Sequence, residues 1–274
     1  MIGKLYVVGT PIGNLGDMSP RAIETLKKVD FIAAEDTRVT LKLLNRFEIK
    51  TPMISYHEHN KLSRHEEISS RILNGESGAI VTDAGMPAIS DPGEDLVRYC
   101  HEKGVPVESV PGPSALITAL AISGMPSTRF SFEGFLPVDK VERTEHLAEV
   151  KDLKHTLIFY EAPHKLLTTL KAMLSVLGDR RVALVRELTK LHETVERTTL
   201  SSAVEKYSSG EARGEFVLII EGAKETEKEE YTLSSAVELA KKYQSEGMSA
   251  SNAAKVTASE TGIRKGDIYK ELIK

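Results

Sequence analysis

The chain has 274 residues, of which 28% are charged and 41% are apolar, and its formal net charge at pH 7 is −4. This length suits two modest domains with a real core, and the acidic balance argues against a protein that grips nucleic acid over its whole surface. The single cysteine, Cys100, excludes a disulfide framework and a thiolate zinc site, and it fits a reducing compartment. We see neither a signal peptide nor an apolar run of the roughly 20 residues that cross a bilayer, so we expect a cytoplasmic protein without membrane contact.

Strands and helices alternate along the first half of the chain. Short apolar runs bounded by glycine or proline predict buried strands, and apolar residues at helical spacing predict the helices between them. The predicted strands are 4–9, 31–34, 52–56, 78–82 and 105–110. Because successive strand–helix steps form a mostly parallel sheet with helices on both faces, we predict that architecture for residues 1–124. The nearly all-apolar stretch 114–123 is expected to be a buried helix.

A helix is also predicted to begin directly after the loop that follows strand 78–82. Asp91 is a good N-cap residue, Pro92 fits the first helical position, and apolar residues follow at helical spacing up to Gly104.

A change in composition at Gly124-Met125-Pro126-Ser127 predicts a second α/β domain, residues 125–223. Its predicted strands are 130–136, 156–160, 182–185, 194–200 and 216–220, with helices at 141–153, 164–177 and 201–207. Residues 193–200 alternate in polarity, which favours a mixed sheet.

The stretch 224–230 is almost all Lys and Glu and is predicted to be a linker. Three short amphipathic helices are expected in residues 231–274, where Gly247 and Gly262 end the first two and Ser249 caps the second. Their pattern fits a helix-turn-helix or, equally, a generic three-helix unit.

Three loops rich in glycine and proline follow predicted strands. They are Gly9-Thr10-Pro11-Ile12-Gly13, the stretch from Asp83 to Gly93, and Pro111-Gly112-Pro113-Ser114. Each by itself is as well explained by an ordinary tight crossover. Because ligands bind at the carboxyl ends of parallel strands, the repetition predicts that the three loops form one site.

Six motifs in one order resemble the ribosomal RNA small subunit methyltransferase I family, which belongs to the tetrapyrrole-methylase-like (class III) methyltransferases. The resemblance covers residues 1–222, and the C-terminal helices resemble that family's small appended helix-turn-helix domain. The loop of Gly85-Met86-Pro87, in place of the Gly-Asp-Pro of tetrapyrrole-acting relatives, favours the RNA branch. The motifs are Gly9-Thr10-Pro11-Ile12-Gly13-Asn14-Leu15, Ala34-Glu35-Asp36-Thr37-Arg38, Thr82-Asp83-Ala84-Gly85-Met86-Pro87 with Ser90-Asp91-Pro92-Gly93, Pro111-Gly112-Pro113-Ser114, Tyr160-Glu161-Ala162-Pro163-His164 and Arg186-Glu187-Leu188-Thr189-Lys190.

The resemblance implies two α/β domains with a ligand cleft between them and a small all-α C-terminal domain. It also implies a homodimer that binds S-adenosylmethionine in the cleft and methylates the ribose 2′-oxygen of a cytidine in the decoding region of 16S ribosomal RNA, in the small ribosomal subunit. The cofactor-binding residues that we expect are Gly9, Pro11, Ile12, Gly13, Asp83, Gly85, Met86, Pro87, Ser90, Pro111, Ser114, Ala115, Tyr160, Glu161 and Phe216.

A ribose hydroxyl needs a proton acceptor, and the candidates are the carboxylates at strand ends, Asp36, Glu161 and Glu187. Each also has a purely structural interpretation: Asp36 as a helix cap or a partner of Arg38, and Glu187 as a group that orients Lys190. The expected RNA-binding residues are Arg38, Lys42, Arg46, Lys165, Arg186 and Lys190.

His57-x-His59 lacks a zinc-binding spacing, so we expect no metal site. Two alternatives remain open. One is a small-molecule methyltransferase of tetrapyrrole type, and the other is a nucleic-acid-binding regulator whose α/β body senses a ligand.

Overall fold

The computed structural model describes residues 2–210, 212–224 and 231–274. Residues 1–223 form one compact unit and residues 224–274 form a second. Of the predicted linker 224–230, all but Lys224 lies outside the described residues. Within the described ranges, no helix has the length and apolar character that spanning a membrane requires.

All strand pairs of the first sheet are parallel, in agreement with the mostly parallel sheet that was predicted. Its strand order is β3-β2-β4-β1-β5, so the first strand in sequence lies between the fourth and the fifth. The strands are β1 (Leu5–Val8), β2 (Phe31–Ala34), β3 (Met53–Ser55), β4 (Gly78–Val81) and β5 (Val107–Val110).

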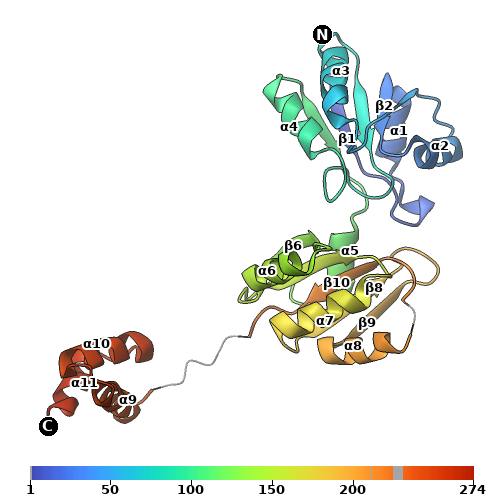
Figure 1. Cartoon of the computed structure of the whole chain (residues 1–274). Coiled ribbons are helices and arrows are strands. Elements are labelled where there is room, and N and C mark those ends of the chain that lie inside the picture. The colour runs from blue at the N-terminus through green and yellow to red at the C-terminus, as the bar shows by residue number, and fades with distance from the viewer. Residues whose placement is uncertain (1, 211, 225–230) are drawn as a thin grey trace. The chain divides into compact units, whose positions relative to one another are not determined.

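Helices cover both faces of this sheet (Figure 1). Successive strand residues point to opposite faces, so Ile32 packs with α1 and α2, whereas Phe31 packs with α3 and α4. The helical segments are η1 (Leu15–Asp17), α1 (Pro20–Lys28), α2 (Thr37–Arg46), α3 (Lys61–Leu73) and α4 (Glu94–Glu102).

The predicted start of α4 is wrong. The helix begins at Glu94, its N-cap is Gly93, and no side chain caps it. Gly93 has φ +139°, a conformation that a helix cannot continue through, so Asp91 and Pro92 remain part of the preceding loop.

The second sheet is mixed, again as predicted, with order β6-β7-β10-β8-β9. Only β6 and β7 are parallel neighbours, and the other pairs are antiparallel. Its strands are β6 (Phe130–Phe135), β7 (Thr156–Glu161), β8 (Arg181–Arg186), β9 (Thr194–Thr199) and β10 (Phe216–Ile220).

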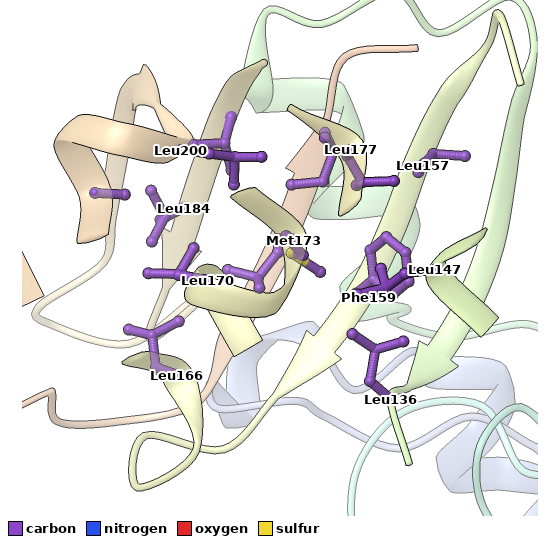
Figure 2. Close-up of a cluster of buried hydrophobic side chains, with 14 of the residues drawn as sticks. Leu136, Leu147, Leu157, Phe159, Leu166, Leu170, Met173, Leu177, Leu184 and Leu200 are labelled. Carbon is purple, nitrogen blue, oxygen red and sulfur yellow. The ribbon is translucent and has the colours of Figure 1, made fainter. Parts of the chain in front are cut away.

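One face of this sheet packs against α6 (Lys140–Val150), α7 (Leu166–Leu177) and α8 (Leu200–Ser208). Figure 2 shows the resulting core, in which Leu170 and Met173 of α7 lie over the sheet and Phe159 packs beside Leu147. These side chains are fully buried. Burying each one contributes about 1.5–3 kcal/mol, so this core stabilises the second sheet.

Helix α5 (Ala115–Ser123) covers the opposite face of the second sheet (Figure 1). Leu116 and Leu120 pack against Ile158, Val185 and Ile219. Helix α5 therefore packs on the second sheet, although it precedes the domain boundary that was expected after residue 124.

The C-terminal unit consists of α9 (Leu233–Ser245), α10 (Ala250–Thr261) and α11 (Lys265–Leu272). Ser249 caps α10, and Gly262 ends it in the left-handed conformation, as predicted. The helices share a small core of their own around Ala236, Ala254 and Ile268.

Candidate active site

The loops after β1, β4 and β5 meet at the carboxyl edge of the first sheet, as predicted. The amide of Thr10 donates to the carbonyl of Gly85 at 2.9 Å, and the amide of Gly85 donates back at 3.2 Å. The third loop approaches so closely that a Cβ atom on Gly9 would lie 2.7 Å from the Cα atom of Gly112. Glycine is required at both positions because the two backbones touch.

The loop from Gly85 to Gly93 has an unusual backbone. Gly85, Ala88, Ser90 and Gly93 all have positive φ angles, of +88°, +70°, +61° and +139°. A positive φ costs a non-glycine residue of order 1 kcal/mol or more, and such strain concentrates at functional sites. The surrounding packing therefore fixes this loop in a shape that it would not adopt alone.

A cavity of about 400 Å³ lies between these loops and the end of the second sheet where β7 and β8 finish and β10 starts. Its volume is within the range of small-ligand sites. Two thirds of the predicted cofactor-binding residues line it, namely Ile12, Asp83, Gly85, Met86, Ser90, Ser114, Ala115, Tyr160, Glu161 and Phe216.

The remaining predicted cofactor-binding residues do not line the cavity. Gly9 packs on Gly112, and Gly13 packs against the backbone of Leu188 and the side chain of Lys190. Pro11, Pro87 and Pro111 belong to the same loops. These five residues therefore shape the walls without facing the cavity.

Asp36 does not line the cavity. Its carboxylate caps α2 by accepting the amide of Arg38 at 2.8 Å, and it pairs with that side chain at 2.6 Å. The Arg38 guanidinium holds the pKa of Asp36 well below its usual range. Asp36 is thus held as a helix cap and an ion-pair partner of Arg38, which is its structural interpretation, and its catalytic role stays a prediction.

Glu161 lines the cavity, but both of its oxygens are engaged. Oε1 accepts the amide of Ala162 at 2.8 Å, and Oε2 accepts the hydroxyl of Thr169. The residue is only 4% exposed. It is therefore held as a structural acceptor at the end of β7.

Glu187 also lines the cavity, and its partner is Lys190, whose Nζ atom lies 3.0 Å from Oε1. The hydrogen bond from Lys190 lowers the pKa of Glu187. An ion-paired carboxylate of lowered pKa accepts a proton weakly.

Three other carboxylates line the first-sheet wall of the cavity, and two of them, Glu35 and Asp91, are absent from the predicted set of site residues. Oε2 of Glu35 accepts the amide of Asp83 at 3.3 Å, which ties the ends of β2 and β4 together. Burial raises the pKa of Glu35 and of Asp83. Burial, followed by the charges of Glu35 and Asp83, raises the pKa of Asp91 to about 6.

Of the predicted RNA-binding residues, only Lys190 lines the cavity. Arg38, Lys42 and Arg46 project from the exposed side of α2, opposite the buried Thr40 and Leu44. Lys165 and Arg186 are half-buried outside the cavity, near the ends of α7 and β8. The basic residues thus form no continuous lining.

Among the residues that the structure describes, no cluster of three or more His, Cys, Asp or Glu side chains is placed to hold a metal ion. The rings of His57 and His59 lie edge to face with centroids 6.0 Å apart.

Known proteins match both the sequence and the fold. The family model of tetrapyrrole (corrin/porphyrin) methylases matches residues 4–204. The ribosomal RNA small subunit methyltransferase I of Halalkalibacterium halodurans is 48% identical over 97% of this chain and 93% of its own length. The protein of the same name from Escherichia coli O157:H7 is 42% identical over 98% of this chain and 94% of its own.

A solved structure with the same fold contains a bound nucleoside. It is the uroporphyrin-III C-methyltransferase of Thermus thermophilus in complex with S-adenosylhomocysteine. The match covers 80% of this chain and 97% of that protein's chain, with a TM-score of 0.57. At 19% identity, this likeness concerns the fold alone.

Proposed function

Because the chain belongs to the tetrapyrrole methylase family and, within it, to the ribosomal RNA small subunit methyltransferase I family, we propose that it methylates 16S ribosomal RNA. The proposed acceptor is the ribose 2′-oxygen of a cytidine in the decoding region, and the proposed donor is S-adenosylmethionine. The match of nearly the whole chain to relatives of that name, at 42–48% identity, carries this proposal. We further propose that the enzyme acts as a homodimer on the small ribosomal subunit, in the cytoplasm.

The cavity fits the proposed donor in size and charge. Glu35 and Asp83 place negative charge on one wall, which suits an ammonium group and a sulfonium. Ser114 and Ala115 bring the N-terminal end of α5 to the cavity, and a helix N-terminus favours a carboxylate. When bound, the donor supplies an electrophilic methyl group, and the protein supplies alignment.

Ten cavity residues from the predicted set are the proposed donor contacts. They are Ile12, Asp83, Gly85, Met86, Ser90, Ser114, Ala115, Tyr160, Glu161 and Phe216. Gly9, Pro11, Gly13, Pro87 and Pro111 are proposed to act indirectly, by fixing the loops that carry these contacts.

Asp91 is the proposed proton acceptor for the ribose hydroxyl. It lines the cavity, and no hydrogen bond or ion pair engages it within the described ranges. A base works best when its pKa lies near the working pH, and the pKa of Asp91 is about 6. Glu161 and Glu187 are weaker candidates because their carboxylates are already bonded.

The exposed side of α2 is the proposed phosphate-binding surface. Lys42 and Arg46 are exposed, and neither has an ion-pair partner in the described part of the chain. Each phosphate that such a side chain neutralises releases a counterion, so their removal should weaken subunit binding and reduce its salt dependence. Lys190 in the cavity is proposed to contact the acceptor nucleotide.

The central test is a tritiated-methyl transfer assay on small subunits from cells that lack this protein. We expect label in the ribose of one cytidine of 16S RNA. Label in protein or in a nucleobase would reject the proposed reaction, and label from a porphyrinoid acceptor without RNA would favour the small-molecule alternative.

Asp91→Asn tests the proton acceptor within the same assay. We expect a loss of 10²- to 10⁴-fold in the transfer rate, the range typical of general bases, with unchanged calorimetric binding of S-adenosylhomocysteine. The exposed Asp17→Asn is the matched control. A transfer rate for Asp91→Asn within threefold of wild type would remove Asp91 from this role.

A further inference from the structure

Phe135 is an aromatic side chain exposed at the wall of the cavity. It is the last residue of β6, it lines the cavity, and it is 55% exposed. Exposing a phenyl ring costs hydrophobic stabilisation that burial would supply. Ile89, which is 44% exposed, lines the same cavity from the strained loop of the first domain.

A β-bulge turns this ring toward the cavity. The pairing of β6 with β7 shifts between Phe132 and Gly134, and Gly134 has φ +66°. In a regular strand, Phe132 and Phe135 would point to opposite faces because they are three residues apart. Here both rings contact Tyr160, with centroid distances of 4.8 Å and 5.6 Å. Bulges next to active sites commonly redirect a side chain in this way.

The ring is also held in a fixed position. Phe135 lies opposite Tyr160 in the strand pairing, and their rings meet edge to face at 62°. Tyr160 is itself fixed because its hydroxyl accepts the amide of Leu116 at 3.1 Å. A rigid aromatic ring that is partly open to the cavity offers a planar apolar surface at low entropic cost.

We propose that Phe135 is the platform on which the base of the acceptor nucleotide stacks in the cavity. The inference rests on the proposed function, because it assigns the acceptor end of the same site. RNA readers stack unpaired bases on aromatic side chains, and a nucleobase is a flat ring of matching size. The negatively charged wall opposes a phosphate at this point and accommodates a base with donor groups, such as the amino group of cytosine.

Asp91 lines the same cavity and is close enough to Tyr160 that its charge contributes to the raised pKa of that phenol. A base stacked on Phe135, next to Tyr160, would bring the ribose of the same nucleotide toward Asp91. Phe135 would thus contact the base, and Asp91 the ribose, of the same nucleotide.

A direct test uses fluorescence, since the chain contains no tryptophan. F135W introduces a sole indole at the platform, and V138W introduces one three residues further on, at a position that is 73% exposed and outside the cavity. We expect a short single-stranded, cytidine-containing oligonucleotide to quench F135W saturably and to leave V138W unchanged. Equal quenching of both variants, or no quenching of either, would overturn the assignment of Phe135 as the platform.

The transfer assay supplies an independent test. Removing a stacking aromatic costs about 1–3 kcal/mol per base, so kcat/KM of F135A should fall about 5- to 150-fold. F135Y keeps an aromatic ring and should transfer methyl groups like the wild type, whereas F135L should be impaired like F135A. V138A is the matched control. Binding of S-adenosylhomocysteine should be unchanged in all of them.

Four outcomes of these assays would overturn the inference while leaving the proposed function intact. Two concern activity: full activity of F135A, and equal activity of F135L and F135Y. The other two concern F135A itself: a loss of S-adenosylhomocysteine binding, and a changed sedimentation coefficient. Failure of the wild-type protein to label ribose would instead reject the proposed function itself. Quenching of F135W by the oligonucleotide is measured without any methyl transfer, so the two failures are distinguishable.

Discussion

Asp91→Asn should make the protein more stable while it slows methyl transfer. Asp91 is half-buried, and its pKa rises from the usual 3.8 to about 6 because burial and the charges of Glu35 and Asp83 oppose its ionisation. This cluster also interacts electrostatically with Asp36 and Arg38 after β2, His57 after β3 and Tyr160 on β7.

The size and the pH dependence of the gain follow from the difference in pKa. Each pH unit of difference is worth about 1.4 kcal/mol, so full ionisation of a wholly buried group would cost about 3 kcal/mol. Solvent reaches this half-buried side chain, and we therefore expect about 1–2 kcal/mol. Below pH 3.8 the carboxyl is protonated in both folded and unfolded chains, so the penalty is absent. It grows as the pH rises to 6 and is complete above that.

Urea unfolding followed by circular dichroism, between pH 4 and pH 8, measures this difference. The free energy of unfolding of Asp91→Asn should match wild type near pH 4 and exceed it by about 1–2 kcal/mol at pH 8. Asp17→Asn, at an exposed site, should follow wild type throughout. A variant that is no more stable at pH 8, or whose gain is the same at every pH, would refute the reasoning. Glu35→Gln should raise the free energy of unfolding by less than Asp91→Asn does, because it removes only one of the two charges that repel the Asp91 carboxylate.

Three further changes test the backbone and the core. Ala88→Gly should raise the free energy of unfolding by about 0.5–1 kcal/mol in calorimetry, because it relieves a φ of +70°; an unchanged melting temperature would argue against strain there. Gly9→Ala should destabilise by about 1–3 kcal/mol in urea titrations, since its methyl group would lie 2.7 Å from the Cα atom of Gly112, and wild-type stability would disprove the close approach. Phe159→Ala should cost about 3–5 kcal/mol because the ring is fully buried, whereas Phe130→Ala, at a 37% exposed position, should cost less; equal losses would contradict the assigned core.

The convergence of the three glycine- and proline-rich loops could be predicted because it follows from strand direction alone. Parallel strands bring their carboxyl ends to one edge of the sheet, so the loops near Gly9, Asp83 and Gly112 had to be neighbours once the strands were identified. Strand direction did not supply Glu161 and Phe216 on the second sheet, which were expected from the family resemblance. Their strands are antiparallel, and the pairing places the start of β10 opposite the end of β7.

The sequence misled where a local signal competed with backbone geometry. Asp91-Pro92-Gly93 has the composition of a helix start. A helix cannot continue through Gly93, however, because its φ is +139°. Asp91 therefore does not cap the helix, and it lines the cavity instead. Local propensity cannot reveal this, because the positive φ angles of the loop are imposed by packing around it.

Phe135 and Glu35 escaped prediction for a different reason. Side-chain alternation along β6 places Phe135 away from Phe132, and only the bulge at Gly134 reverses that. Glu35 follows a buried strand, like many carboxylates that merely face solvent. What distinguishes it is the pairing of β2 with β4, which brings its side chain to the amide of Asp83.

The distribution of strain links stability to the proposed chemistry. Of the five non-glycine residues with positive φ in the described ranges, Ala88 and Ser90 lie in one loop at the cavity, and Glu187 and Thr189 lie in the facing loop of the second domain. Strained residues of this kind persist only where the surrounding structure holds them. The rigid cores behind each loop, together with the packing of Gly13 against Leu188 and Lys190, provide that support. Because the loops are set before any ligand arrives, less conformational entropy is lost when donor and acceptor are aligned, and alignment is the main contribution that a protein makes to a methyl transfer.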